Sequence, residues 1–136
     1  MAREGKRSRE GARRFLRRGS IPLVVHGLGE YGLGVLFIIG PSALSFDSDT
    51  AKVASILIGA GIVVMAALTD YPTALVRRLP LDSHIVLDFV LSLFVVASPF
   101  ILGFTDDAAA VAFFLILGIA YLALTVLTRY RRHESR

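Results

Sequence analysis

The chain has 136 residues, of which 54% are hydrophobic and 19% charged, and its formal net charge is +4 at pH 7. Its mean hydropathy is +0.65, and the charges gather at the chain ends and in short gaps, a distribution that excludes an ordinary soluble domain. The chain has no cysteine, which excludes disulfides and thiolate metal sites.

A polar tail precedes four apolar stretches. The tail, residues 1–20, is rich in arginine. The apolar stretches are residues 21–44, 51–68, 83–104 and 108–128. Each reaches or approaches the roughly 20 residues that cross about 30 Å of hydrocarbon as a helix, and their continuous apolar runs lack the alternation of a transmembrane β-strand. We therefore predict an all-α, four-helix transmembrane bundle.

Polar gaps of two kinds separate these stretches. Residues 45–50 and 105–107 are short acidic turns, whose Asp and Thr side chains can cap the helix that follows. A longer connector carries two prolines at its ends and two arginines at its centre. The chain then divides into a basic tail (1–20), a first two-helix repeat (21–70), a connector (71–82), a second two-helix repeat (83–128) and a basic C-terminus (129–136).

The basic residues predict how the bundle is oriented. Fourteen of the fifteen Lys and Arg residues lie in the tail, the connector or the C-terminal segment, and Lys52 lies elsewhere. The positive-inside rule places those three segments in the cytoplasm and the two acidic turns outside. Because the basic residues flank apolar spans, we expect them to contact anionic lipid headgroups and expect no nucleic-acid binding.

An internal repeat relates the two halves of the chain. Sliding the second half back by 58 residues aligns His26 with His84, Glu30 with Asp88, Gly34 with Ser92, Pro41 with Pro99, Asp49 with Asp107, and Ala51 with Ala109. The same offset is expected to hold through both helices and the turn. Since each unit contains two spans, both copies enter the membrane in the same direction, which predicts a pseudo-two-fold axis along the membrane normal.

Three segments carry a resemblance to a known family. They are residues 68–72 (LTDYP), residues 79–84 (LPLDSH) leading to Asp88, and above all residues 97–104 (ASPFILGF), with Ser98, Pro99 and Phe100 at its centre. The chain resembles the SPW-repeat integral membrane proteins of bacteria over nearly all of its length after the tail. It departs from the family pattern at Phe100, where the family usually has Trp, and around Pro41, where the first copy reads GPS. The resemblance implies a recurring two-helix unit and brings no activity with it.

Two pairs of ionisable residues lie inside the predicted spans. His26 and Glu30, like His84 and Asp88, are spaced i,i+4 near the cytoplasmic ends of their helices, and Gly34 and Ser92 continue each stripe one turn deeper. Ionisable groups within a span are costly and usually mark a functional site. Three interpretations stay open: contacts that fasten helices together, a proton or ion site, and a divalent-metal site. Spacing alone assigns no metal.

Small residues mark a predicted packing surface on the second span. Ala51, Ser55 and Gly59 form a small-x-x-x-small face, which suits either contact within the chain or a seam between two copies. Pro41 and Pro99 lie near the outer ends of their helices, where they are expected to kink or end them.

The sequence carries no recognised catalytic or cofactor motif. We therefore expect no enzyme activity and no cofactor. The favoured function is a structural, accessory or interaction component of the bacterial plasma membrane, with a second copy or another membrane protein as partner. The alternative is a small proton-linked transporter or channel that uses the four ionisable residues.

Overall fold

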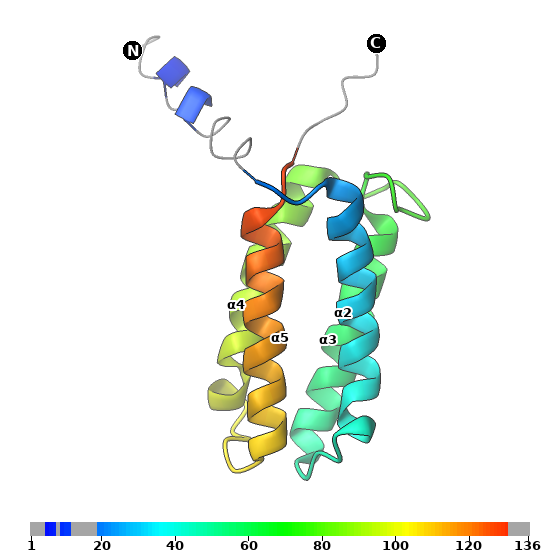
Figure 1. Cartoon of the computed structure of the whole chain (residues 1–136), viewed down its shortest axis with the longest axis vertical. Coiled ribbons are helices and arrows are strands. Elements are labelled where there is room, and N and C mark those ends of the chain that lie inside the picture. Colours follow the sequence, from blue (N-terminus) through cyan, green and yellow to red (C-terminus); the bar gives the residue numbers. More distant parts are fainter. Residues whose placement is uncertain (1–4, 8, 12–18, 131–136) are drawn as a thin grey trace.

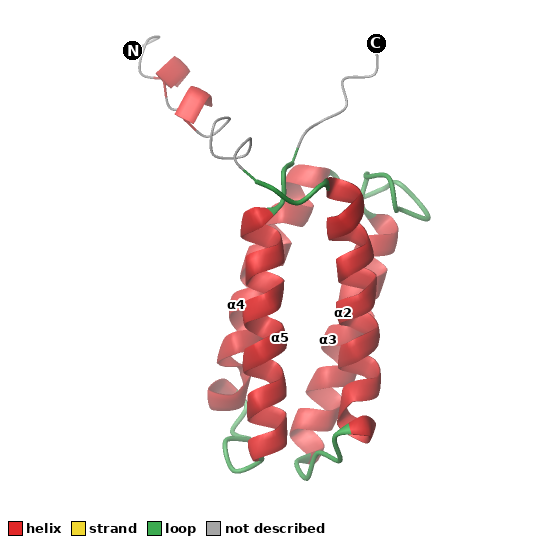
Figure 2. Cartoon of the chain, in the orientation of Figure 1, coloured by secondary structure: helices red, strands yellow, loops and turns green. Residues whose placement is uncertain are grey.

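The computed structural model describes residues 5–7, 9–11 and 19–130, and four long helices form the bundle (Figures 1 and 2). They are α2 (Leu23–Ala43), α3 (Asp49–Leu68), α4 (Leu81–Ile101) and α5 (Ala108–Leu127). The helices contain 20 or 21 residues each, which at about 1.5 Å per residue gives the thickness of a bilayer core. The described part of the chain is all-α, as the sequence predicts.

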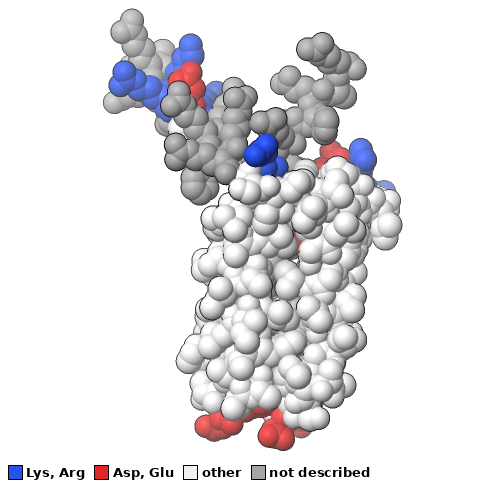
Figure 3. Space-filling model, in the orientation of Figure 1, with Lys and Arg blue, Asp and Glu red and all other residues white. Residues whose placement is uncertain are grey.

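Two antiparallel hairpins build the bundle. Helices α2 and α3 pack along their length, as do α4 and α5, and between the hairpins α2 contacts α5 and α3 contacts α4. The connector and the described segments at both chain ends lie at one end of the bundle, and the two short turns lie at the other (Figure 1). In Figure 3, Lys and Arg appear at the first end, with acidic residues beside them, and Asp and Glu line the second end. The predicted headgroup contacts of the tail fall mostly on residues 1–4, 8 and 12–18, which lie outside the described residues.

The outer wall of the bundle is apolar. All four helices are long and apolar enough to cross a membrane, and only 28% to 33% of each span is buried inside the bundle. Large apolar side chains face outward along the wall, including Leu57 (67% exposed) and Phe100 (66% exposed). The side of the bundle drawn in Figure 3 is almost entirely uncharged at its surface between the two ends. Lipid is the solvent that such a surface requires, and the chain is a multi-pass membrane protein.

The first helix of each hairpin ends in the same motif. In α2 the amide of Phe46 donates to the carbonyl of Pro41 (3.0 Å), and Ser45 has a left-handed backbone with φ 52°. In α4 the corresponding bond joins Phe104 to Pro99 (3.1 Å), and Gly103 has φ 74°. This hydrogen bond, from an amide to the carbonyl five residues earlier, satisfies a carbonyl that would otherwise lack a partner at the helix end. Both prolines lie inside their helices, which end two residues later.

The acidic turns also cap the helices that follow them. Ser48 accepts a hydrogen bond from the Ala51 amide, and Asp107 accepts one from the Ala110 amide. The second carboxylate oxygen of Asp107 accepts from the amides of Asp47 (2.8 Å) and Ser48 (2.9 Å). Asp107 therefore ties the turn of the first hairpin to the turn of the second.

The repeat has two offsets rather than one. Helices α2 and α4 end 58 residues apart, but α3 and α5 begin 59 apart, because the second turn has six residues and the first has five. The buried positions of α3 pair with those of α5 at this larger offset, Ala51 with Ala110 and Gly59 with Gly118. The expected pairing of Ala51 with Ala109 and Asp49 with Asp107 is therefore wrong by one residue.

Small residues bring α2 and α3 into close contact. A Cβ atom placed on Gly59 would lie 2.5 Å from the Gly34 carbonyl oxygen, and one on Gly34 would lie 2.9 Å from the Gly59 carbonyl oxygen. The Ser55 hydroxyl donates to the Phe37 carbonyl. The face of Ala51, Ser55 and Gly59 thus packs within the chain. Ser92 is buried on α4 and donates to the carbonyl of its own helix three residues earlier.

Candidate functional site

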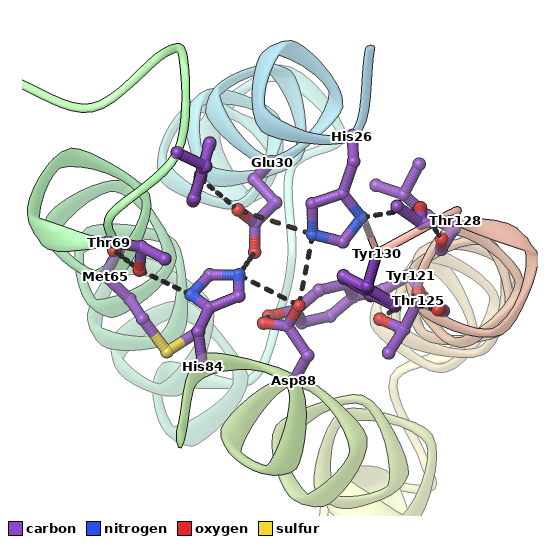
Figure 4. Close-up of polar contacts among 12 residues, drawn as sticks. His26, Glu30, Met65, Thr69, His84, Asp88, Tyr121, Thr125, Thr128 and Tyr130 are labelled. Atoms are coloured by element: carbon purple, nitrogen blue, oxygen red, sulfur yellow. Dashed lines mark hydrogen bonds and ion pairs between the residues drawn. The ribbon is translucent and has the colours of Figure 1, made fainter. Parts of the chain in front are cut away.

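The four ionisable residues of the spans meet in the centre of the bundle (Figure 4). His26 and Glu30 come from the first turns of α2, and His84 and Asp88 from the first turns of α4. The i,i+4 spacing turns each pair toward the same side of its helix. All four side chains are 0% exposed. We call these four residues the His/acid cluster.

Within the His/acid cluster, histidines and carboxylates alternate around a ring. Nε2 of His84 lies 3.1 Å from Oε1 of Glu30 and 3.0 Å from Oδ2 of Asp88. Nε2 of His26 lies 3.2 Å from the same Asp88 oxygen and 3.7 Å from Oε2 of Glu30. Each histidine therefore approaches one carboxylate from its own helix and one from the other hairpin.

Two threonines fix which nitrogen of each histidine faces inward. Nδ1 of His26 lies 2.8 Å from the Thr128 hydroxyl oxygen, and Nδ1 of His84 lies 2.6 Å from that of Thr69. Each threonine hydroxyl donates its single proton to the carbonyl four residues earlier in its own helix. The threonine oxygen must then accept from the ring, so each Nδ1 carries a proton and each Nε2 points into the cluster.

Two tyrosines hold the carboxylates in the same way. The Tyr71 hydroxyl donates to Oε2 of Glu30 (2.6 Å), and the Tyr121 hydroxyl donates to Oδ1 of Asp88 (2.7 Å). Tyr71 lies in the connector, where burial and the Glu30 carboxylate raise the pKa of its hydroxyl well above the ordinary value. Tyr71 therefore stays protonated and remains a donor.

The inward-facing atoms lack hydrogen-bond partners. Four of the buried side-chain atoms without a partner among the described residues belong to the cluster, one from each residue: Nε2 of His26 and His84, Oε1 of Glu30 and Oδ2 of Asp88. They lie within ion-pair distance of one another but without hydrogen-bond geometry. Buried polar atoms are seldom left unpaired, so a proton or a bound ion is needed among them.

Comparison with known protein families matches residues 24–128 to the SPW repeat domain. The chain belongs to this family. The matched segment contains the whole His/acid cluster and the threonines and tyrosines that support it. No curated protein and no solved structure gives a match.

Contacts between the two halves of this SPW-repeat protein come in matched pairs. The bond from His26 to Thr128 has its counterpart in the bond from His84 to Thr69. The short backbone pairing of Ile21 with Thr128 likewise corresponds to that of Leu79 with Thr69. Each half therefore makes the same kind of contact with the other half, and the two-fold axis itself stays a prediction.

The contacts of the two carboxylates differ between the halves. Tyr130 is the counterpart of Tyr71, and each packs edge-on against a histidine, with ring centroids 5.6 and 5.5 Å apart. The Tyr130 hydroxyl, however, donates to the Thr125 carbonyl, and it is Tyr121 that reaches Asp88. Asp88, at the position equivalent to Glu30, therefore takes its tyrosine partner from α5, whereas Glu30 takes its partner from the connector.

A glycine makes room for the connector above the cluster. A Cβ atom on Gly27 would lie 2.4 Å from the Tyr71 ring and even closer to the Thr73 hydroxyl. The Tyr31 hydroxyl, one turn further along α2, donates to the Thr73 carbonyl (3.1 Å). Together these contacts seat Tyr71 over Glu30.

An apolar layer separates the cluster from the acidic end of the bundle. Phe37, Ile62, Val95 and Phe114 fill the core there, all 0% exposed. An apolar groove of about 590 Å³ opens on the outer wall between Asp49 and Leu102, at the acidic end and away from the cluster. In this conformation the cluster lies close to one face of the membrane.

The sequence pointed to the four ionisable residues but did not predict which residues hydrogen-bond to them. Thr69, Thr128 and Tyr121 do not stand out in apolar spans, because a lone hydroxyl is a common helix residue. The position of the two threonines could have indicated their role. Each follows the last residue of its helix, at the end of the bundle where the histidines lie. The family residues Pro41, Ser98 and Pro99 are buried at the opposite end and take no part in the cluster.

Proposed function

We propose that this SPW-repeat protein is a non-enzymatic, multi-pass component of the bacterial plasma membrane with a structural or accessory role, in which the His/acid cluster fastens the two hairpins together. The observation that carries this proposal is that both carboxylates contact a histidine of the other hairpin. Lipid gives hairpins no hydrophobic driving force to associate, so polar contacts in the core supply the adhesion.

The core beneath the cluster supports this role over transport. A channel or transporter needs a polar path, and between the cluster and the acidic turns the fully buried Phe37, Ile62, Val95 and Phe114 close the core. The hydroxyls of the serines buried there, Ser55, Ser92 and Ser98, are already bonded to helix carbonyls. A proton-linked transporter is the rival function, favoured by the presence of four ionisable side chains in one membrane-embedded site. It would require a second conformation that opens the apolar layer.

Proton flux separates the two functions. The purified full-length protein would be placed in liposomes with an internal pH-sensitive dye and a potassium diffusion potential, beside protein-free liposomes. We expect no proton flux above the protein-free level. Flux that is present in the wild type and lost in Glu30→Gln would contradict the structural role and establish the transporter.

The proposed orientation puts the connector and both termini in the cytoplasm. It is supported by Arg77, Arg78 and Arg129 at one end of the bundle, against acidic turns with Lys52 at the other. Anionic headgroups of the inner leaflet are the partners that suit those arginines.

Cysteine labelling tests this orientation directly, because the chain has no cysteine of its own. Leu75 in the connector is 80% exposed, and Asp49 at the acidic end has a 94% exposed side chain. In intact cells, a membrane-impermeant maleimide should label Asp49→Cys and should label Leu75→Cys only after lysis. The reverse pattern would overturn the orientation.

A further inference from the structure

We propose that the inward-facing atoms of the His/acid cluster bind one divalent transition-metal ion, with Zn²⁺ the best-matched ion. The inference goes beyond the structural role proposed above and does not rest on it. The four ligands would be Nε2 of His26 and His84 and one carboxylate oxygen each from Glu30 and Asp88.

The arrangement of these atoms is the first argument. Each of the four residues has one bonded polar atom facing outward and one unbonded, fully buried atom facing the centre. An ion at the centre would satisfy all four unbonded atoms at once. A cluster built only for salt bridges would be expected to align its donors and acceptors, and here the short contacts lack that alignment.

The separations suit four-coordinate binding. With bonds of about 2.0–2.1 Å, neighbouring ligand atoms of a tetrahedral site lie about 3.3 Å apart. Three contacts between the inward-facing atoms measure 3.0 to 3.2 Å. The fourth contact of the ring, 3.7 Å, joins Nε2 of His26 to the Glu30 oxygen that Tyr71 holds. One ligand atom from each residue can be chosen so that all lie within 4.8 Å of one another. Binding would draw the widest pair up to about 1.5 Å closer.

Every ligand already has the outer partner that metal sites use. Metal-binding histidines donate their second N–H to an acceptor, and metal-binding carboxylates accept a hydrogen bond on their second oxygen. Thr128 and Thr69 supply the acceptors for the two histidines, and Tyr71 and Tyr121 supply the donors for the two carboxylates. These partners fix the ring orientations with Nε2 aimed at the centre.

Charge balance gives a further argument. Two buried carboxylates place two negative charges in a medium of low dielectric constant, where the free-energy cost of an unbalanced charge is high. A divalent cation with two neutral imidazoles cancels that charge with a single bound particle. Two protons on the histidines are the competing solution, and they are the outcome that the experiment must distinguish.

The ligand set selects the class of metal. Two imidazole nitrogens and two carboxylate oxygens suit Zn²⁺ and its first-row neighbours. Mg²⁺ and Ca²⁺ prefer six or more oxygen ligands, which the cluster does not offer. The cluster contains no thiolate, so it does not suit Cu⁺.

Metal content of the full-length protein tests the proposal. Protein purified without a histidine tag, stripped with a chelator and reconstituted in lipid nanodiscs would be dialysed against Zn²⁺ and analysed by elemental mass spectrometry. We expect one ion per chain, and a higher thermal unfolding temperature with Zn²⁺ than with chelator. Co²⁺ in place of Zn²⁺ should give the intense visible absorption of a tetrahedral centre.

Two variants make the test specific. His84→Ala should abolish stoichiometric binding, whereas His133→Ala, which removes the third histidine of the chain, should retain it. Because His84→Ala can fail to fold, Tyr121→Phe provides a second test that keeps all four ligands. Loss of its outer-shell bond should weaken Zn²⁺ binding about 10-fold to 100-fold.

The proposal is overturned by wild-type protein that binds no Zn²⁺ and shows no tetrahedral Co²⁺ spectrum, in which case protons balance the cluster. It is equally overturned by binding that survives His84→Ala or disappears in His133→Ala. The flux assay has a separate readout, so either proposal can fail while the other stands.

Discussion

Oε1 of Glu30 lies 3.1 Å from Nε2 of His84, and the two residues belong to different hairpins. The reciprocal contact joins Asp88 to His26 at 3.2 Å. Because these pairs cross the bundle in both directions, each hairpin supplies a partner for the buried ionisable groups of the other. The two repeats of the sequence are thus joined by the histidine and the carboxylate that each repeat contributes to the cluster.

Removing one carboxylate should destabilise the bundle strongly. Asp88→Asn leaves two buried histidines without one of their partners, and breaking a buried ion pair in this way costs about 3–5 kcal/mol. Unfolding by SDS in mixed micelles, with chelator present, measures the loss. Asp49→Asn is the matched control, since its exposed contact with Lys52 contributes at most about 1 kcal/mol. Equal effects of the two variants would contradict the structural role of the cluster.

Close contact between α2 and α3 makes a second prediction. Gly59→Ala places a Cβ atom 2.5 Å from a backbone oxygen of Gly34, so the helices must separate, at a cost of about 1–3 kcal/mol. Gly61→Ala, two residues along the same helix, meets no atom within 4 Å and should cost nothing. The same SDS titration compares them, and a loss at Gly61 as large as that at Gly59 would count against the packing.

The two helix ends differ in a way that mutation can exploit. Ser45 and Gly103 occupy equivalent left-handed positions, and a non-glycine residue there carries a strain of about 1–2 kcal/mol. Ser45→Gly should therefore raise stability by up to about 1 kcal/mol. Gly103→Ser should lower it by a similar amount. A Ser45→Gly variant that is less stable than the wild type would show that the serine side chain makes a contribution of its own.

The acidic end should lose stability in acid. Burial by itself raises the pKa of Asp107, but hydrogen bonds from the backbone amides of Ser48, Ala110 and Asp47 outweigh it, so the pKa is lowered overall. A lowered folded-state pKa means that the carboxylate stabilises the fold above the unfolded value of about 3.9 and that this contribution is lost as the pH falls through the folded value. The stability difference between wild type and Asp107→Ala should be constant near neutrality and shrink below about pH 3.9. A difference that stays constant down to pH 2 would contradict a role for the charge.

Much of the architecture follows from the sequence, because lipid imposes simple rules. The first span, expected at residues 21–44, forms a helix over Leu23–Ala43, and the last, expected at 108–128, forms one over Ala108–Leu127. Length and hydropathy alone set these limits. The repeat also placed the two His/acid pairs on equivalent helices.

The remaining features depend on three-dimensional contacts. Convergence of the four side chains required the relative rotation of α2 and α4, which helical spacing does not contain. Tyr121 reaches Asp88 from the middle of α5, where its hydroxyl is hidden in an apolar run. The extra residue in the second turn shifted the register of α5 by one, and only the buried faces of α3 and α5 reveal it.

A double-mutant cycle between Glu30 and His84 tests the central claim, that one buried cluster joins the two hairpins. The free energy of unfolding would be measured for the wild type, Glu30→Gln, His84→Ala and the double variant. Residues in contact within one network show a coupling of about 0.5–3 kcal/mol, and for this fully buried pair we expect at least about 1 kcal/mol. Additivity within about 0.5 kcal/mol, as found for distant sites, would contradict the account.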